Sequence, residues 1–476
     1  MVGGPTLLRA SPAWAGERRR GLLEVSGKES PIDTVVVVMM ENRSFDHYFG
    51  WLADDERYIE RGKRRHGRKF HVDGETRQEY PAPDGTVVPT APWLESGDPN
   101  PFRGCGHPDP GHSWDHGRAQ RDGGFLAEGS RNDAFALGYY EADGLPFLAK
   151  LAREFTVFDH WHASVLTSTY PNRAYLHSAQ SGGVTGNTVP VETGGYDWPT
   201  IWDRLGAAGV PAAYYHTDLP TVLLWGNRLT AFDHPIDDYF TQAAAGELPN
   251  VVFVDPAFLS GNRTDDHPHA DIRAGQRFMR DVFRAFAESK HWKNGLFVVT
   301  YDEWGGFFDH VSPPVLPDDR ASAVDAENFG QAGFRVPTVV ASPFARRGFV
   351  DHRLYDHTSV LRFLEWRFLG APPKGPGKDG DSWYLTTRDR NTRNLGASLL
   401  VEEPEREVGF DLDLALDAPS EPCPEDGGPP LPPASALPAA AQTEKHSFEL
   451  AMDEGYFERV GYEVRPSLMA REWARA

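Results

Sequence analysis

Short runs of β-branched and aromatic residues recur along the chain, and each ends in polar residues or in a Gly/Pro cluster. Nearly continuous Val, Ile and Phe content is typical of strands that are buried on both faces of a parallel sheet. This pattern predicts strands at residues 34–40, 155–158, 211–215, 251–254, 296–300 and 337–341. Helical spacing between these runs predicts helices at residues 146–154, 200–208, 272–290 (with Asp271 as N-cap) and 358–369. The alternation indicates an α/β fold with a central, mostly parallel sheet flanked by helices.

Two stretches interrupt this alternation. Residues 51–113 are polar and rich in Pro and Gly, and they contain the basic run RGKRRHGRK at residues 61–69. A segment of this length is typically a lid or a surface excursion. We interpret the basic run as a solvated charged loop, with contact to anionic headgroups as the alternative. The Pro/Ala content of residues 418–443 predicts an extended linker. We therefore expect an N-terminal segment (1–32), a core domain (33–417), this linker, and a short helical tail that packs on the core (444–476).

Composition narrows the class of protein. The 476 residues include 48 Lys+Arg and 69 Asp+Glu, which gives a formal net charge of −21. Such an acidic chain is long enough for a large core and is not expected to bind nucleic acid. No stretch approaches the roughly 18–20 continuous apolar residues of a membrane-spanning helix. We therefore expect a soluble protein with at most peripheral membrane contact.

The two cysteines, Cys105 and Cys423, are too few for a disulfide scaffold or a Cys-based zinc site. We interpret them as two unrelated thiols, with pairing in an oxidising compartment as the alternative. The N-terminus lacks the charged start and apolar region of a secretory signal. Residues 13–15 (AWA) are similar to a signal cleavage site, so a signal shortened by a misplaced start codon is an alternative, and localisation stays open.

Candidate chemistry lies directly after two of the predicted strands. Glu41 and Asn42 follow the first strand, and Asp302 and Glu303 follow the strand at 296–300. Parallel sheets bind ligands at the carboxyl ends of their strands, and adjacent carboxylates repel unless a positive charge lies between them. The two acidic sites therefore predict a bound divalent cation. Single polar residues after a strand are more often helix caps or satisfied side chains, and this is our interpretation of Asp46, His47, Asp309 and His310.

A third segment, HASVLTSTYPNR at residues 162–173, places several hydroxyls before a Pro-Asn-Arg turn and a helical run. Turns of this composition are usually only caps. A hydroxyl at a helix N-terminus beside a cation can, however, act as a nucleophile.

Five motifs together resemble a known family. They are MMENRSFDHYFG, TSTYPNR, DDHPHADIRAGQ, YDEWGGFFDHVSPP and YDHTSVLRFLEWRF, which occur in this order between residues 33 and 369. They are similar to the bacterial phosphoesterase family that contains the phospholipases C and acid phosphatases of the AcpA type, within the alkaline phosphatase superfamily. The resemblance implies an alkaline-phosphatase-like core and does not cover the tail.

The resemblance also implies roles for individual residues. The metal ligands are then Glu41, Asn42, Thr169, Asp302 and Glu303. Thr169 matches the nucleophile, and Asn42 matches a residue that contacts the phosphoryl oxygens, with Arg173 as a further candidate. The histidines around the phosphoryl group are then His112, His267 and His357, with His116, His216 and His269 as alternatives. An oxygen-rich donor set favours Ca²⁺, Mg²⁺ or Mn²⁺ over Zn²⁺. The histidines either provide a second, softer site or act as acids, one of them protonating the leaving group.

The resulting hypothesis is a metal-dependent phosphoesterase. A cation lowers the pKa of the Thr169 hydroxyl, which attacks phosphorus, expels an alcohol and leaves a phosphothreonine for water to hydrolyse. A phospholipase C-type phosphodiesterase is expected, and a zwitterionic phospholipid fits the acidic chain better than a strongly anionic one. The chain ends without the extra β domains of the larger phospholipases C, so an acid phosphatase is the alternative. A non-catalytic protein that binds a phosphoryl ligand is an alternative of another class. The family also favours an exported or cell-surface protein.

Overall fold

The computed structural model describes residues 19–259, 263–370, 383–402, 405–423, 447–463 and 467–474. An eight-stranded sheet runs through its centre in the order β13-β6-β12-β11-β1-β10-β8-β9. Its strands are β1 (Thr34–Met40), β6 (Thr156–Phe158), β8 (Ala212–His216), β9 (Asp233–Pro235), β10 (Val251–Asp255), β11 (Gly295–Tyr301), β12 (Val339–Ala341) and β13 (Phe349–Asp351). Strands β11, β1, β10 and β8 are parallel neighbours, which confirms the predicted α/β class with a mostly parallel sheet. The predicted strand at 337–341, β12, differs because it runs antiparallel to both of its neighbours.

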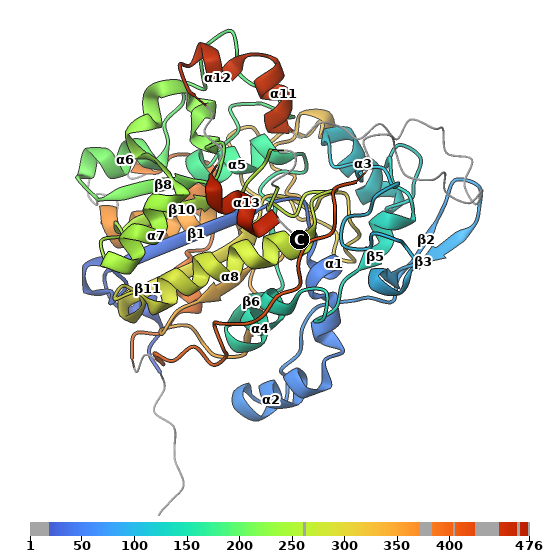
Figure 1. Ribbon diagram of the computed structural model, residues 1–476, viewed down its shortest axis with the longest axis horizontal. Helices are drawn as coiled ribbons and strands as arrows, with labels where there is room; N and C mark the ends of the chain where they lie inside the picture. The colour runs from blue at the N-terminus through green and yellow to red at the C-terminus, as the bar shows by residue number, and fades with distance from the viewer. Residues whose placement is uncertain are drawn as a thin grey trace, which may run out of the picture.

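The central strands of the sheet are largely apolar and need helices to cover their faces. Every residue of β1, β10 and β11 is buried. Helix α8 (Ile272–Glu288) lies along the sheet in Figure 1, with α7 (Ile236–Ala245) and α4 (Pro146–Glu154) packed against it. The Asp271 carboxylate caps α8 by accepting a hydrogen bond from the Arg273 N–H at 3.0 Å, as predicted. A second group of contacting helices contains α5 (Thr169–Ser178), α6 (Ile201–Ala208) and α9 (Thr358–Leu364), which continues as a π-helix over Glu365–Leu369.

The excursion at 51–113 is more regular than a loop. It contains α2 (Glu56–His66) and a hairpin of β2 (Glu79–Pro81) and β3 (Val87–Pro89). The prediction of a charged loop was therefore wrong for most of the basic run, which belongs to α2. The Asp55 carboxylate caps this helix at the Tyr58 N–H, and the helix ends at Gly67, whose φ of 105° few other residues adopt.

Shorter elements complete the fold. They are α1 (Phe45–Phe49), α3 (Trp114–Gly123), α10 (Thr387–Asn391), and two short sheets that pair β4 (Ala91–Pro92) with β5 (Gly138–Tyr139) and β7 (Trp161–His162) with β14 (Tyr355–Asp356). No helix in the described ranges is long and apolar enough to cross a membrane.

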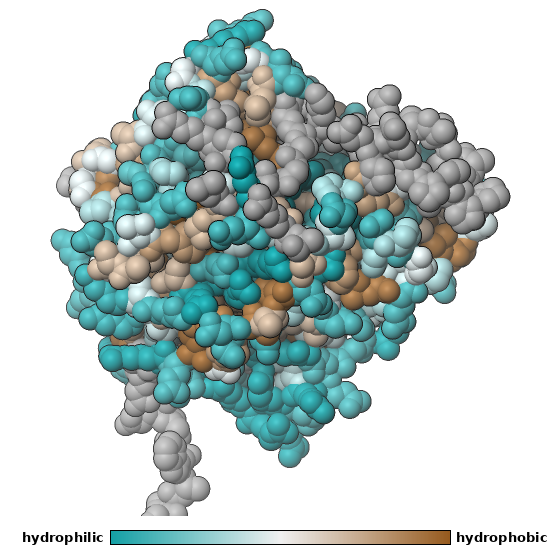
Figure 2. All heavy atoms as spheres, in the orientation of Figure 1, coloured by the Kyte–Doolittle hydropathy of each residue, from teal (hydrophilic) through white to brown (hydrophobic). Residues whose placement is uncertain are grey.

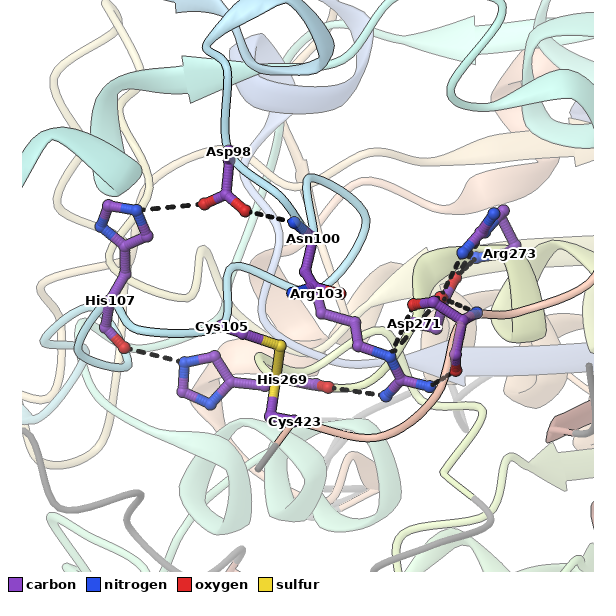
Figure 3. The surroundings of a disulfide bond; sticks show 10 residues. Asp98, Asn100, Arg103, Cys105, His107, His269, Asp271, Arg273 and Cys423 are labelled. Atoms are coloured by element: carbon purple, nitrogen blue, oxygen red, sulfur yellow. Dashed lines mark hydrogen bonds and ion pairs between the residues drawn. A yellow bond between two sulfur atoms is a disulfide. The ribbon is translucent and has the colours of Figure 1, made fainter. Parts of the chain in front are cut away.

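A disulfide joins Cys105 to Cys423, so the interpretation of two unrelated thiols was wrong. The cysteines are 318 residues apart, and only the fold brings them together. Figure 3 shows the surroundings of this bond, in which Arg103 donates to the backbone carbonyls of His269 and Ser420. Residues 418–423 are thus held against the core, whereas the rest of the predicted linker, 424–443, lies outside the described residues. So do residues 1–18 of the N-terminal segment.

The tail contains α11 (Ser447–Asp453), α12 (Tyr456–Arg459) and α13 (Leu468–Ala474). The Tyr456 hydroxyl donates to the Leu223 carbonyl at 2.6 Å, and the Trp473 indole donates to the Asp281 carboxylate at 2.8 Å. Each of these contacts ties a tail helix to the core domain, and Figure 1 shows α13 beside α8.

Candidate active site

The two predicted acidic sites emerge side by side at the carboxyl edge of the sheet. Strands β1 and β11 are parallel neighbours in which Met40 pairs with Tyr301, so the residues that follow them leave the sheet together. The Asn42 N–H donates to Asp302 Oδ1 at 3.1 Å, and the Arg43 N–H donates to the Glu303 carbonyl at 3.1 Å. The topology therefore brings Glu41 and Asn42 to Asp302 and Glu303, as the sequence predicted.

The close approach of these two loops requires the glycine at position 305. Gly305 has a φ of 63°, and its N–H donates to Glu303 Oε2 at 2.7 Å. A Cβ atom at this position would lie 2.1 Å from the Asn42 carbonyl oxygen. Asn42 itself adopts a left-handed conformation with a φ of 58°. Gly305 and Asn42 thus both adopt left-handed backbone conformations at the point where the two loops meet.

Arg173 lies among these carboxylates, and its guanidinium is buried. It donates to Asp255 Oδ1 at 2.9 Å and to Asp302 Oδ2 at 3.2 Å, and it lies 3.3 Å from Glu41 Oε1. Its Nη2 also donates to the backbone carbonyls of residues 39 and 40. The structure therefore places Arg173 as the counterion of protein carboxylates, and not as the predicted contact to the phosphoryl group. Asp255 ends strand β10 beside β1, and the sequence analysis missed it although it directly follows a predicted strand.

The buried carboxylates outnumber the guanidinium that lies among them. Glu41, Asp255, Asp302 and Glu303 are all at most 4% exposed. Burial raises the pKa of Asp255 and of Asp302 to about 7, and it also raises the pKa of Glu41 and of Glu303. Glu303 Oε1 and Asn42 Oδ1 are buried and accept no hydrogen bond from the described residues. This gathering of buried carboxylates and the two oxygens without donors fit the coordination of a divalent cation.

Thr169 is the first residue of α5 and is 1% exposed. It lies one helical turn before Arg173, so the two residues share a face of the helix, and that face points toward Glu41 and Asp302. The preceding loop is fixed by Asn172, whose side-chain amide donates to the carbonyls of Val165 and Thr167. The helix N-terminus thus presents a hydroxyl on the side of the carboxylates, where its dipole favours negative charge.

His112 adjoins the carboxylates through Asn42. Its Nδ1 donates to the Pro110 carbonyl at 2.7 Å, which leaves Nε2 with a lone pair. His112 Nε2 lies 3.3 Å from Asn42 Nδ2 and 3.9 Å from Glu303 Oε1. His267 packs nearby, with its ring centroid 5.6 Å from that of His112. The structure therefore brings two of the three predicted histidines together.

Asp109 completes a group with these histidines. Its Oδ2 lies 3.7 Å from His267 Nε2 and 4.0 Å from His112 Nδ1. One ligand atom from each of the three side chains lies within 4.8 Å of the others. The sequence analysis did not include Asp109, although it precedes His112 by three residues in HPDPGH. One carboxylate and two imidazoles form a donor set softer than the all-oxygen set beside it.

His357 is placed differently from its prediction. Its Nε2 donates to the Asp302 carbonyl at 2.6 Å, and its Nδ1 accepts from the Trp161 indole at 3.3 Å. Burial lowers the pKa of His357 to about 4, so the ring is neutral at physiological pH. Both ring nitrogens are engaged by the protein, and the histidine therefore supports the backbone of Asp302 and does not face a phosphoryl group.

The alternative histidines also have partners within the protein. His216 lies 2.7 Å from Asp233 Oδ1 and 2.8 Å from the Tyr462 hydroxyl. His269 Nε2 donates to the His107 carbonyl at 2.9 Å, near the disulfide (Figure 3). His116 follows the cap of α3, with its N–H directed to the Ser113 hydroxyl. The contacts of His216 and His269 indicate that both histidines hold neighbouring parts of the fold together.

The cluster of Asp46, Asp309 and His310 surrounds a buried arginine. Arg335 donates to Asp46 Oδ1 at 3.0 Å and to Asp309 Oδ1 at 2.9 Å. His310 Nδ1 lies 2.5 Å from Asp46 Oδ2. Although these three side chains have the spacing of metal ligands, the guanidinium occupies the space between the carboxylates. His47 likewise donates from Nδ1 to the Gly138 carbonyl, at 2.6 Å.

Comparisons with known proteins bear on this site. The chain matches the model of the Phosphoesterase family over residues 32–369. Non-specific phospholipase C1 of Arabidopsis thaliana is 32% identical over 70% of this chain and 66% of that protein. Non-hemolytic phospholipase C of Pseudomonas aeruginosa is 30% identical over 76% of this chain and 57% of that protein. The matched region thus spans less than two thirds of each of these relatives.

Among solved structures, a protein in the alkaline phosphatase superfamily from Vibrio parahaemolyticus aligns with a TM-score of 0.32 and 10% identity. The alignment covers 63% of this chain and 74% of that one.

Proposed function

Because the chain belongs to the phosphoesterase family, we propose that it is a metal-dependent phosphodiesterase of the phospholipase C type. The observation that carries this proposal is the carboxylate cluster at the ends of β1 and β11, whose Glu41 and Asp302 pair with Arg173, one helical turn after Thr169 on α5. Within residues 32–369, which match the family model, this part of the structure contains the candidate nucleophile Thr169, several buried carboxylates, and His112 and His267.

The oxygen-rich cluster would hold a divalent cation, with Ca²⁺, Mg²⁺ or Mn²⁺ favoured by its donor atoms. The ligands in this proposal are Glu41, Asn42, Thr169, Asp302 and Glu303. A bound cation would offset the buried negative charge and polarise the oxygens that contact it. Asp109 and His267, together with His112 in its neutral form, would provide a second, nitrogen-containing set, which is the alternative to a role of His112 as an acid because a protonated imidazole cannot bind a metal.

In the proposed reaction, the Thr169 hydroxyl passes its proton to solvent and its oxygen attacks phosphorus, while the bond from phosphorus to the departing alcohol breaks. A phosphothreonine that still carries the headgroup remains until water attacks its phosphorus, which releases the phosphorylated headgroup and restores the Thr169 hydroxyl. The N-terminus of α5 and the Asn42 amide stabilise the equatorial oxygens of the phosphoryl group. Arg173 and His357 have supporting roles in this proposal and do not touch the substrate. Arg173 holds the carboxylates in place, and His357 holds the backbone of Asp302.

His112 is the proposed acid for the leaving group. Its Nδ1–H is held by the Pro110 carbonyl, so a second proton must sit on Nε2, which faces Asn42 and Glu303. A His112 ring protonated at Nε2 can donate that proton to the departing alcohol.

The proposed substrate is a phospholipid with a zwitterionic headgroup. The two relatives described above are named as phospholipases C. The net charge of −21 disfavours a strongly anionic headgroup in the pocket. The disulfide between Cys105 and Cys423 supports work in an oxidising compartment, as expected of an exported or cell-surface protein.

The proposal is tested by hydrolysis of p-nitrophenylphosphorylcholine, a choline diester, by wild type, Thr169→Ala and Ser168→Ala. We expect Thr169→Ala to lose about three powers of ten in rate or more, because no covalent route remains. Ser168→Ala is the matched control, since Ser168 is the adjacent hydroxyl and its side chain makes no capping hydrogen bond to α5. We expect it to keep a rate within about threefold of wild type.

The same assay identifies the ester class and the need for metal. Activity that disappears with a strong chelator and returns with added Ca²⁺, Mg²⁺ or Mn²⁺ supports the proposed site. Preference for p-nitrophenyl phosphate over the choline diester would replace the phosphodiesterase with a phosphatase. Near-wild-type turnover by Thr169→Ala would end the proposed mechanism.

A further inference from the structure

The basic run of the excursion forms a helix that projects from the body of the molecule. Helix α2 lies at the lower edge of the molecule in Figure 1, beyond the sheet and its covering helices. Its stretch from Glu56 to Lys69, ERYIERGKRRHGRK, contains seven Lys or Arg and two Glu. This local positive charge stands against a net charge of −21 for the whole chain.

One side of α2 is fixed by packing. Tyr58 and Gly62 are buried, and the Tyr58 ring meets the Phe70 ring edge to face with centroids 5.5 Å apart. A Cβ atom at Gly62 would lie 2.1 Å from the Phe70 ring, so this glycine lets the helix approach closely. The helix is therefore held in one orientation, with its other side directed outward.

Three of the basic side chains form hydrogen bonds or ion pairs within the protein. Arg61 donates to the Arg153 carbonyl, Lys63 pairs with Glu60 at 2.9 Å, and Arg65 pairs with Glu405 at 2.9 Å. Four further basic residues are exposed, and their side chains form no hydrogen bond or ion pair with the described residues. They are Arg57, Arg64, Arg68 and Lys69.

We propose that this outward side of α2 and its C-terminal turn docks the protein on a bilayer that contains anionic phospholipids. The docking surface is defined by Arg57, Arg64, Arg68 and Lys69. Figure 2 shows a hydrophilic surface over the lower part of the molecule where α2 lies, so the contact is electrostatic and lacks an inserted apolar anchor.

Projection of the helix makes such contact compatible with an acidic protein. Charges farther apart than about 10 Å are largely screened at 0.1 M salt. A flat bilayer can touch this projecting helix without lying against the rest of the molecule. A flexible polyanion such as RNA or DNA would instead also meet the acidic surroundings. The choice of a bilayer over a nucleic acid rests in addition on the proposed function, whose substrate is a membrane lipid.

The test is co-sedimentation of the full chain with vesicles of phosphatidylcholine alone or with 30 mol% phosphatidylglycerol, at low and high NaCl. We expect the anionic vesicles to bind at least about tenfold more tightly at low salt, and the difference to vanish at high salt. The variant R57E/R64E/R68E/K69E should lose this preference. The matched control K28E/K293E/R406E/R471E changes the net charge equally at exposed positions outside α2, and it should keep the preference.

Several outcomes overturn the proposal. They are equal binding of wild type to both vesicle types, an equal loss in the control variant, and tighter binding of wild type to duplex DNA or RNA than to the anionic vesicles. Turnover of soluble p-nitrophenylphosphorylcholine is measured for every variant and should not change, because this substrate needs no bilayer. Lack of turnover in wild type, with binding to vesicles that depends on α2, would refute the proposed function and support the docking surface.

Discussion

His310 links the excursion at residues 51–113 to the core through ion pairs with Asp73 and Asp46. It contacts Asp46 Oδ2 at 2.5 Å and lies 3.3 Å from Asp73 Oδ1, beside the buried Arg335. Partial burial opposes the charged form, but the hydrogen bond that His310 donates to the Asp46 carboxylate and the negative charge of that carboxylate raise the pKa of His310 to about 8. A histidine whose pKa is higher in the folded than in the unfolded state stabilises the fold only while it is protonated.

We therefore predict that the free energy of unfolding falls as the pH rises from about 6.5 to 8. The contribution of His310 is complete below the unfolded pKa and is lost through the folded pKa, and its size is about 1 to 2 kcal/mol. The measurement is urea unfolding at a series of pH values for wild type and His310→Gln. The free energy of unfolding of the variant should change less between these pH values than that of wild type. Identical pH profiles would show that His310 does not cause the fall in stability.

At this scale the sequence predicted four residues that follow strands, but it missed Asp255, which follows the predicted strand at 251–254, and it missed roles that depend on distant partners. Glu41, Asn42, Asp302 and Glu303 could be predicted because a parallel sheet gathers its strand ends at one edge. The role of Arg173 could not, since its three carboxylate partners come from β1, β10 and β11.

At the scale of elements, the tail helix α11 reaches the neighbourhood of the site. Phe448 stacks on Phe258 with ring centroids 4.5 Å apart, and it meets the Tyr170 ring at 5.1 Å. Tyr170 adjoins Thr169, and the Arg173 guanidinium lies 4.9 Å from the centre of the Phe258 ring. The tail therefore contacts Tyr170, which adjoins the proposed nucleophile Thr169, and Phe258, which packs against Arg173.

We predict that Phe448→Ala lowers the free energy of unfolding by about 3 kcal/mol and lowers kcat for the choline diester more than it raises KM. The physical reason is a cavity behind Tyr170 and Phe258 that loosens the start of α5. Met452→Ala on the same helix is the control, because Met452 is 40% exposed. Thermal unfolding and steady-state kinetics measure both effects. Unchanged kinetics in Phe448→Ala would show that the tail only stabilises the fold.

Strands with a continuous apolar run could be predicted nearly to the residue, as β1 (Thr34–Met40) was. Helix α2 was missed because its buried side consists of only Tyr58 and Gly62, which gives almost no apolar periodicity. The antiparallel direction of β12 was missed because burial alone does not encode strand direction.

At the scale of the whole molecule, the disulfide holds distant segments around the histidines. Cys105 lies on the loop that leads to Asp109 and His112, and Cys423 lies on the segment whose Ser420 bonds Arg103 and Asp271 (Figure 3). This pairing could not be predicted from the spacing of two cysteines along the chain.

We predict that the double variant C105S/C423S loses about 2 to 4 kcal/mol of folding free energy. It should also bind divalent metal more weakly, because the loop that carries Asp109 and His112 is then less restrained. Urea unfolding and calorimetric titration with Mn²⁺ measure the two effects. The control is wild-type protein whose disulfide has been reduced and then reoxidised, which should recover the stability and metal affinity of untreated wild type. Unaltered metal affinity in the variant would limit the disulfide to a stabilising role.

The central claim is that Thr169 becomes covalently phosphorylated during turnover. Wild-type enzyme is mixed with p-nitrophenylphosphorylcholine and a divalent cation, quenched in acid within one turnover, and digested for mass spectrometry. The account predicts a phosphate or phosphorylcholine adduct on Thr169, with none on the same peptide of Thr169→Ala. An adduct on another residue, or turnover by wild type with no adduct at any quench time, would contradict it.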